Sequence, residues 1–278
     1  MSNRIVIEPG AKHKNYWRDL WNYRGLFYFL AWRDVLVRYK QTVIGIAWSI
    51  LRPLITILIM TLIGSFFKIP VPTGVPRALF VCAATLPWQF FSSTFSEASN
   101  SLISNSNLLT KVYFPRLIVP LSTVIVCLID FLISFAILIV MMIVFQYIPD
   151  WKIILLPLFL ALALLVAIGA GLFIAALNVK YRDFKYIVPF IVQFGVYVAP
   201  IAFSSETVYS SGFPWILKFI YSINPMVGVI DGFRWCIFGS SSNIYVPGFL
   251  ISVAISFFFV FLGIWYFRKT ERSFADIV

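Results

Sequence analysis

Ionisable side chains are scarce in this sequence, and their scarcity limits the classes of protein that it can encode. Only 12% of the 278 residues are charged, one residue is a histidine, and 61% are hydrophobic. With a mean hydropathy of +0.92, the chain has little room for a soluble domain. Proton-driven transporters usually carry a chain of ionisable residues inside the bilayer. Here only Arg52, Asp130 and Glu97 fall within or near the long apolar runs, which argues against such a relay.

Several chemical motifs are also missing. Cys82, Cys127 and Cys236 are widely separated, so the sequence has neither a disulfide framework nor the CxxC spacing of a metal site. No GxxxxGKS/T sequence occurs, so the chain lacks the phosphate-binding loop of a P-loop ATPase. We therefore predict no catalytic residue, no metal and no cofactor in this chain. The N-terminal residues contain no apolar stretch typical of a signal peptide, so we expect the apolar runs themselves to direct membrane insertion.

Long apolar runs dominate what is present. A helix needs ~20 predominantly apolar residues to cross the hydrocarbon core of a bilayer, and six segments approach that requirement. We therefore predict an all-α membrane protein with a six-span transmembrane domain at residues 44–267. The spans are expected at residues 44–67, 78–95, 117–147, 153–177, 187–203 and 247–267.

The basic residues set the expected orientation. Most of the 22 lysine and arginine residues lie in four segments that alternate with the spans and so share one side of the membrane. These segments are residues 1–43, 98–116, 178–186 and 268–278. The positive-inside rule assigns that side to the cytoplasm, together with both termini. Nucleic-acid binding is the weaker explanation of the net charge of +11, because the charges follow the membrane topology.

Two segments outside the spans have an amphipathic or apolar character. Residues 15–31 place Trp17 and Trp21 on one face of a helix with Arg18 on the other, a pattern typical of a helix that lies in the membrane interface. The segment 204–246 holds two apolar pieces that are too short to span, so we expect an extracellular helical hairpin that re-enters the outer leaflet. The two pieces are residues 213–223 and 225–238.

Asp130 lies near the middle of the third predicted span, where a charged side chain costs at least ~2.5–3.5 kcal/mol. Two arrangements would reduce that cost. In one, the carboxyl group faces the protein interior and is neutralised or hydrogen-bonded there. In the other, it pairs with Arg52 of the first span, whose long side chain reaches deeper into the membrane.

Small residues recur at every fourth position of the fourth predicted span, at Ala167, Gly171 and Ala175. Such a stripe lets two helix backbones approach closely. The stripe is explained either by helix packing within one subunit or by a dimer contact.

Aromatic residues make up 18% of the chain, and several cluster in the second and fifth predicted spans. They either face lipid and the membrane interface, or they line a path on which the faces of sugar rings slide over aromatic rings. The residues of this candidate substrate path are Trp88, Phe90, Phe91, Phe95, Phe194, Tyr197 and Phe203.

Four stretches of the sequence are informative together. They are RYKQTVIGIAWSILRPL (residues 38–54), NSNLLTKVYFPRLIVPL (105–121), NVKYRDFKYIVPFIVQFGVYVAPIAF (178–203) and NPMVGVIDGFRW (224–235). In this order they resemble the type-2 ABC exporter permeases of lipid-linked polysaccharides such as O-antigen, capsule or teichoic acid. The chain departs from that pattern at Thr42 and Ala199, where a serine is expected, and these departures affect only the expected fine contacts with substrate.

The resemblance implies a half-transporter. Two copies of this subunit would form a channel, and two copies of a separate ATP-binding subunit, which holds MgATP, would dock beneath it. The amphipathic segment 15–31 is similar to the family's interface helix. Two short loops that carry charge and aromatic residues are similar to its coupling helices, although such loops also set topology. The implied coupling residues are Leu108, Leu109, Lys111, Tyr113, Tyr181, Arg182, Asp183 and Phe184. In the extracellular hairpin, Asp231 lies three residues before Arg234 and is placed to pair with it.

These observations favour the membrane subunit of an ATP-driven exporter of undecaprenyl-diphosphate-linked polysaccharide in a bacterial inner membrane, surrounded by membrane lipids. Arg33, Arg38 and Lys40 would suit an anionic diphosphate head group at the cytoplasmic entrance, although topology alone also explains their position. One alternative is a drug or small-lipid exporter of the same family. Another is a secondary transporter or channel that needs no ATPase.

Overall fold

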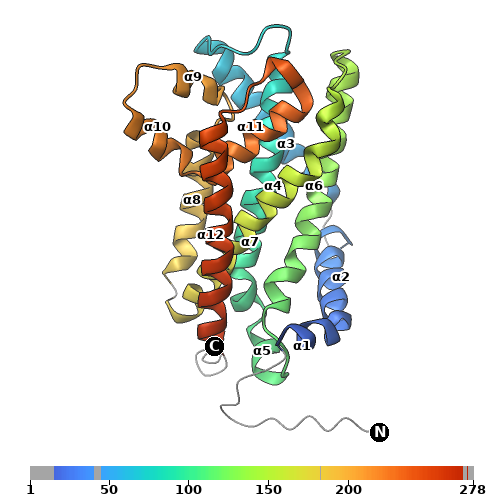
Figure 1. The fold of residues 1–278 in the computed structure, drawn as a ribbon. Helices are drawn as coiled ribbons and strands as arrows, with labels where there is room; N and C mark the ends of the chain where they lie inside the picture. The colour runs from blue at the N-terminus through green and yellow to red at the C-terminus, as the bar shows by residue number, and fades with distance from the viewer. Residues whose placement is uncertain (1–15, 41–44, 182, 272–273, 275–278) are drawn as a thin grey trace.

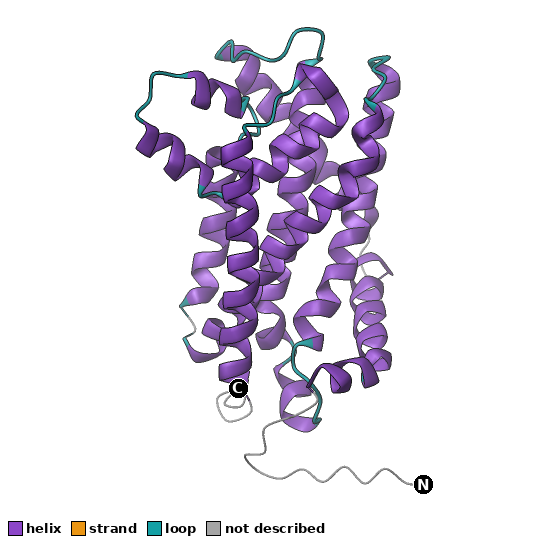
Figure 2. Ribbon diagram, viewed as in Figure 1, coloured by secondary structure: helices purple, strands orange, loops and turns teal. Residues whose placement is uncertain are grey.

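The structure, a computed structural model, describes residues 16–40, 45–181, 183–271 and 274 (Figure 1). Within these ranges the chain is helical and contains no strand (Figure 2), which confirms the predicted all-α class. Thr42 and Arg182 lie outside the described residues, as do the N-terminal 15 residues and most of the predicted C-terminal tail beyond Glu271. The elements are α1 (Tyr16–Asn22), α2 (Arg24–Lys40), α3 (Gly45–Phe66), α4 (Arg77–Ser104), α5 (Ser106–Lys111), α6 (Ile118–Val144), η1 (Trp151–Leu155), α7 (Leu156–Lys180), α8 (Phe184–Val198), α9 (Ser205–Ser210), α10 (Trp215–Ser222), α11 (Pro225–Phe238), η2 (Gly239–Ser241) and α12 (Val246–Thr270).

Among the described residues, five helices are long and apolar enough to cross a membrane, and they correspond to five of the six predicted spans. They are α3, α4, α6, α12 and the continuous run of η1 and α7. The remaining predicted span is α8, whose 15 residues cover about 22 Å, less than the ~30 Å hydrocarbon core. α8 ends at Val198 because Ala199, which precedes Pro200, has an extended backbone. The apolar helices α10 and α11, with η2, are bent by 81° and make a sixth candidate span if they count as one.

The N-terminal amphipathic segment forms two helices, where one was predicted. α1 and α2 are separated at Tyr23, and α2 continues to Lys40, beyond the predicted end at residue 31. Figure 1 shows α1 crossing the lower end of the molecule and α2 running beside the lower part of α6, against which it packs. The last turn of α2 therefore reaches the middle of α6.

Helix α7 packs closely against α4 on one side and α12 on the other, because its small residues allow it. The residues that recur along α7 are all buried: Ala167, Gly171 and Ala175. A Cβ atom added to Gly171 would lie 2.8 Å from the Cβ of Ala98 in α4. A Cβ atom added to Gly263 of α12 would lie 2.1 Å from the carbonyl oxygen of Gly169. The small residues thus serve packing inside one subunit, which is one of the two explanations given above.

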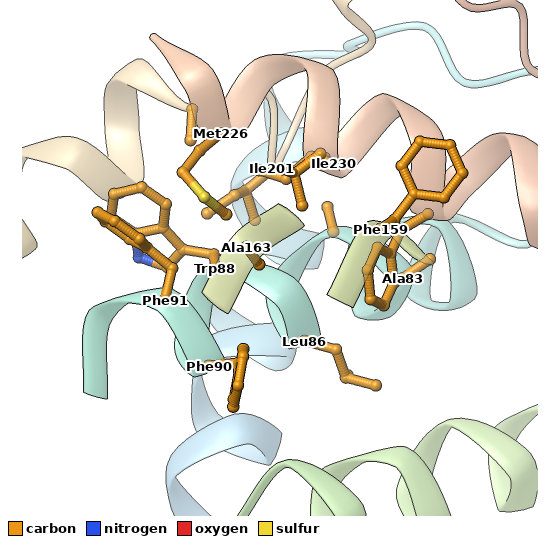
Figure 3. Close-up of a cluster of buried hydrophobic side chains, with 14 of the residues drawn as sticks. Ala83, Leu86, Trp88, Phe90, Phe91, Phe159, Ala163, Ile201, Met226 and Ile230 are labelled. Atoms are coloured by element: carbon orange, nitrogen blue, oxygen red, sulfur yellow. The ribbon is translucent and has the colours of Figure 1, made fainter. Parts of the chain in front are cut away.

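Helix α4 is the central helix of the core. Helices α3, α6, α7, α8 and α11 all pack against it, and most of its residues between Leu79 and Phe95 are buried. Figure 3 shows this part of α4 among apolar side chains of α7, α11 and the segment that follows α8. The core fixes the rotation of α4 about its axis and therefore decides which of its residues meet the polar groups of neighbouring helices.

Candidate functional site

A cavity of about 830 Å³ lies among α2, α3, α4 and α6, with Val192 of α8 at its edge. Its lining is part polar and part apolar, and we refer to it as the polar cavity because charged and polar residues outnumber apolar ones. Its charged lining residues are Asp34, Arg38, Arg52, Glu97 and Asp130. Its uncharged polar lining residues are Ser49, Gln89, Ser92, Ser93, Ser96, Thr123 and Ser134. Only 12% of the chain is charged, so this concentration of polar groups is notable, and polar groups at bilayer depth commonly mark a functional site. The cavity is therefore the candidate functional site.

Asp130, near the middle of α6, is held by three donors. Nη2 of Arg38 lies 2.6 Å from Oδ2, while the hydroxyl groups of Tyr39 and Ser49 donate to Oδ1 at 2.6 and 2.7 Å. α2 supplies Arg38 and Tyr39, and α3 supplies Ser49. The carboxylate is both ion-paired and hydrogen-bonded, which offsets the cost of placing a charge among transmembrane helices.

The structure adopts the first of the two arrangements expected for Asp130, and the predicted pair of Asp130 with Arg52 is wrong. Arg52 lines the same cavity and is exposed, but the salt bridge is made by Arg38. The reason is the direction of α2, which runs beside α6 and brings its own last turn to the middle of that helix. Nη1 of Arg38 also lies 3.1 Å from the carboxylate of Glu97, so one guanidinium connects α2 with both α4 and α6.

The aromatic residues of α4 lie in the core and do not line a path within this subunit. Trp88, Phe91 and Phe95 are spaced three and four residues apart, so they share one face of the helix, and all three are buried. Figure 3 shows Phe90 leaving α4 on a different side from Trp88 and Phe91. Phe90 borders the cavity, but it is 2% exposed and packs its ring against Phe131 of α6. For these four residues the predicted path is therefore wrong within the single subunit.

The side of α4 that faces the cavity is polar. Gln89, Ser93 and Glu97 lie four residues apart, with Ser96 beside them, and all four line the cavity. Their spacing places them on one helical face. Sequence reasoning missed this stripe because it followed the aromatic composition of the span. The spacing of polar residues within an apolar helix was the signal that could have revealed it.

The other predicted path residues do not join those of α4. Phe194 and Tyr197 of α8 are 50% and 64% exposed, and Phe203 is half-buried with its ring 6.5 Å from that of Tyr221. α8 contacts α4 at Gly195, where an added Cβ atom would lie 2.4 Å from Cη2 of Trp88. A role of the exposed α8 aromatics in a path formed with a second subunit stays a prediction.

The basic residues proposed to receive a diphosphate are partly neutralised. Arg33 lies 2.7 Å from the carboxylate of Asp34 and donates to the side-chain carbonyl of Asn105 at 2.8 Å. Arg38 has two carboxylate partners, whereas Lys40 is exposed at the end of α2. A smaller cavity of about 290 Å³ contains Arg33 and shares Asp34 and Glu97 with the larger one. Its other polar lining residues are Ser101, Ser104 and Asn105, so a polar lining continues toward the C-terminal end of α4.

Asp231 and Arg234 of α11 are both buried and their opposite charges attract each other, but the two side chains make no direct salt bridge. Arg234 donates to the carbonyl oxygens of Phe203 and Ile201, both at 2.8 Å. Asp231 accepts a hydrogen bond from the hydroxyl of Ser205 at 2.5 Å. Each charge is satisfied by the segment after α8, and together they fix that segment to α11.

The described coupling residues lie at one end of the molecule. Figure 1 places α5, the C-terminal end of α7 and the start of α8 at the lower end, with α1 and the C-terminal end of α12. The exposed coupling residues are Lys111, Tyr113, Tyr181 and Asp183, whereas Leu108 and Phe184 are half-buried. Leu109 is 3% exposed and packs in a cluster with residues of α2, α6 and α7. Leu109 therefore anchors α5 and offers little surface to a partner.

Glu271 joins three segments at the same end. Its Oε1 atom accepts hydrogen bonds from the hydroxyl of Tyr16 at 3.1 Å and from the backbone N–H of Arg116 at 2.8 Å, and the Arg116 side chain donates to the Glu271 carbonyl oxygen. Burial raises the pKa of Glu271, and burial together with the nearby Glu271 carboxylate raises the pKa of Tyr16. Sequence reasoning missed this cluster because its members lie 155 and 255 residues apart in the chain.

These long apolar helices and the polar cavity among them define a multi-pass α-helical membrane protein. The profile of the family described as ABC-2 type transporter matches residues 25–238, and the chain belongs to that family. It is therefore a transport permease.

The chain is also similar to curated relatives over most of its length. It is 26% identical over 218 residues to the O-antigen export system permease protein RfbA of Myxococcus xanthus, a match that covers 78% of this chain and 82% of the relative. It is 27% identical over 257 residues to the O-antigen export system permease protein RfbA of Klebsiella pneumoniae, covering 88% of this chain and 92% of the relative. A second Klebsiella pneumoniae protein of that name is 26% identical over the same number of residues.

Proposed function

We propose that this chain is the membrane subunit of an ABC exporter that carries O-antigen, linked to undecaprenyl diphosphate, across a bacterial inner membrane. The observation that carries the proposal is the near full-length similarity to permeases named for O-antigen export, which covers 88% of this chain and 92% of one relative. The sequence contains no P-loop motif, so ATP hydrolysis is assigned to a separate ATP-binding subunit that holds MgATP.

The exposed apolar surfaces support an assembly of two copies of this chain. Along α3 the exposed side chains include Trp48, Leu51, Leu54, Ile55, Leu58 and Leu62, and along α8 they include Phe190, Phe194, Tyr197 and Val198. A surface of this kind suits either lipid or another apolar helix. In the proposed assembly, parts of α3 and α8 from each copy face each other around the export path, and the remaining apolar surfaces face membrane lipids.

The proposed orientation places the end that contains α5 in the cytoplasm, with both termini. Most basic residues of the chain fall in the segments near this end, as the positive-inside rule requires. α1, with exposed Trp17 and Trp21, then lies at the cytoplasmic interface. The bent pair of α10 and α11 becomes a hairpin that re-enters the outer leaflet.

A cellular experiment tests the function. Deleting this gene in its host, or deleting the partner ATPase gene, is expected to remove O-antigen from the cell surface and to leave lipid-linked polysaccharide inside. Full-length surface O-antigen in both deletion strains would contradict the proposal. A biochemical experiment tests the mechanism, because lipid-linked polysaccharide should raise the ATPase rate of the purified complex whereas hydrophobic drugs should not.

A further inference from the structure

We propose that the polar cavity among α2, α3, α4 and α6 binds uncharged sugar units of the exported glycan and not the diphosphate of its carrier lipid. This inference rests on the proposed function and adds a defined site to it. Its volume of about 830 Å³ falls within the range of ~300–1,000 Å³ found for small-molecule sites. The smaller cavity continues its polar lining toward the end of α4 that carries α5.

Two facing stripes supply the groups that sugar recognition needs. On α4, Gln89, Ser93 and Glu97 form the polar stripe described above. On α3, Trp48 and Arg52 lie four residues apart and share a helical face, and Trp48 is 56% exposed. The side-chain amide of Gln89 approaches the Thr56 hydroxyl of α3 at 3.5 Å, so the two stripes lie next to each other. Amide, carboxylate, hydroxyl and guanidinium groups offer both donors and acceptors to sugar hydroxyls, and an exposed indole offers an apolar face to a sugar ring.

The charge of the cavity argues against a diphosphate. Its lining holds three carboxylates, Asp34, Glu97 and Asp130, and two guanidinium groups, Arg38 and Arg52. Arg38 is already engaged by two of these carboxylates. Sites for phosphate groups instead concentrate unpaired arginine, lysine and backbone N–H donors. Arg33, which lies outside this lining, pairs with Asp34 at 2.7 Å. Three guanidinium groups therefore balance the three carboxylates, and a diphosphate would find no surplus of positive charge, whereas an uncharged sugar needs none.

Cysteine protection in the full chain tests the site. Cys82, Cys127 and Cys236 are buried and are replaced by alanine, and Ser96→Cys is introduced in the cavity. The matched control is Ser241→Cys, an exposed serine in η2. The purified chain in lipid nanodiscs is treated with a small water-soluble thiol reagent, alone, with O-polysaccharide released from its lipid by mild acid, or with inorganic pyrophosphate.

We expect the polysaccharide to slow the labelling of the Ser96→Cys variant and to leave the Ser241→Cys variant unaffected, while pyrophosphate protects neither. Adding Gln89→Leu or Trp48→Ala should weaken this protection by roughly tenfold, the size expected for losing one or two good contacts. Trp48→Phe keeps an aromatic face and should retain most of the protection. Trp151→Ala changes an exposed tryptophan outside the cavity and should retain all of it. Ser92→Cys offers a second cavity position if the Ser96→Cys variant does not insert.

Three results would overturn the inference. Protection by pyrophosphate and not by polysaccharide would make the cavity an anion site. Labelling that neither compound slows would make it a water-filled cavity only. Failure to label either cavity position, when the Ser241→Cys variant reacts, would show that the cavity is closed. Each can occur while deletion of the gene still removes surface O-antigen, so this inference can fail separately from the proposed function.

Discussion

At the scale of single residues, Arg38 controls how α2 is attached to the membrane core. Its guanidinium contacts carboxylates on two other helices, Asp130 at 2.6 Å and Glu97 at 3.1 Å. A charge-assisted contact to a partly buried carboxylate contributes more than a surface ion pair, because removing one partner leaves the other charge without compensation.

Replacing Arg38 with alanine should therefore lower the stability of the purified chain more than replacing Arg52 does. Both arginines line the same cavity, but only Arg38 holds Asp130. We expect Arg38→Ala to cost about 1–3 kcal/mol, a range reduced for the partial exposure of the pair, and Arg52→Ala to cost little. Thermal unfolding in detergent measures both. If Asp130→Asn added to Arg38→Ala recovers none of the loss, the contact is not the cause.

Glu271 gives a prediction about pH at the same scale. Burial raises the pKa of this carboxyl group, so the folded chain binds a proton more readily than the unfolded chain. Stability should therefore fall as pH rises through the range just above the ordinary glutamate pKa. Glu271→Gln keeps an acceptor for Tyr16 and for the Arg116 N–H, and should make stability in that range less dependent on pH. Equal slopes of unfolding temperature against pH in both proteins would contradict this assignment.

At the scale of elements, α4 shows how one helix serves a core and a cavity together. Its aromatic stripe packs inward and its polar stripe faces α3 and α6. The contact of α4 with α8 is equally specific, because Gly195 leaves room for the indole of Trp88. A Cβ atom at position 195 would lie 2.4 Å from Cη2 of that ring.

Gly195→Ala should therefore push α8 away from α4. We expect a loss of about 1–3 kcal/mol, typical of overpacking a filled contact, and a smaller loss when Trp88→Phe is present to make room. Gly212→Ala is the control, since a Cβ atom there has no neighbour within 4 Å. Equal unfolding temperatures for both alanine variants would mean that α8 adjusts without cost.

The elements also show what could be predicted from the sequence. Hydropathy located five spans because each is a continuous apolar run. It also predicted a span at α8, but the pair Ala199 and Pro200 ends that helix early. The course of α2 could not be inferred, since an amphipathic helix fits either a membrane interface or a neighbouring helix. The partner of Asp130 depended on that course. The cavity itself is formed by residues from five helices, so composition indicated its chemistry only in part.

At the scale of the whole molecule, the proposed contacts with the ATP-binding subunit lie on segments that adjoin the helices of the cavity. α4 carries the polar stripe and ends just before α5, and Arg33 of α2 contacts Asn105 between them. A displacement of α5 by an ATP-binding subunit would therefore be transmitted to α2 and α4, the two helices that the contact between Arg38 and Glu97 connects. The second proposed contact, at residues 181–184, leads directly into α8, which packs on α4.

This arrangement predicts that the exposed loop residues transmit motion and do not maintain the fold. The test variants are Tyr181→Ala and Asp183→Ala, both at exposed positions. Membrane insertion and unfolding temperature should stay unchanged in both. O-antigen export should fall, and ATP hydrolysis by the complex should become insensitive to lipid-linked polysaccharide. Glu206→Ala, at an exposed carboxylate of α9 far from that end, is the matched control and should keep export and stimulation. Export, stimulated hydrolysis and complex formation are measured on the same variants. If the loop variants export normally, the contact with the ATP-binding subunit lies elsewhere. If they fail to assemble with that subunit, the loop is needed for binding it and not only for transmitting its motion.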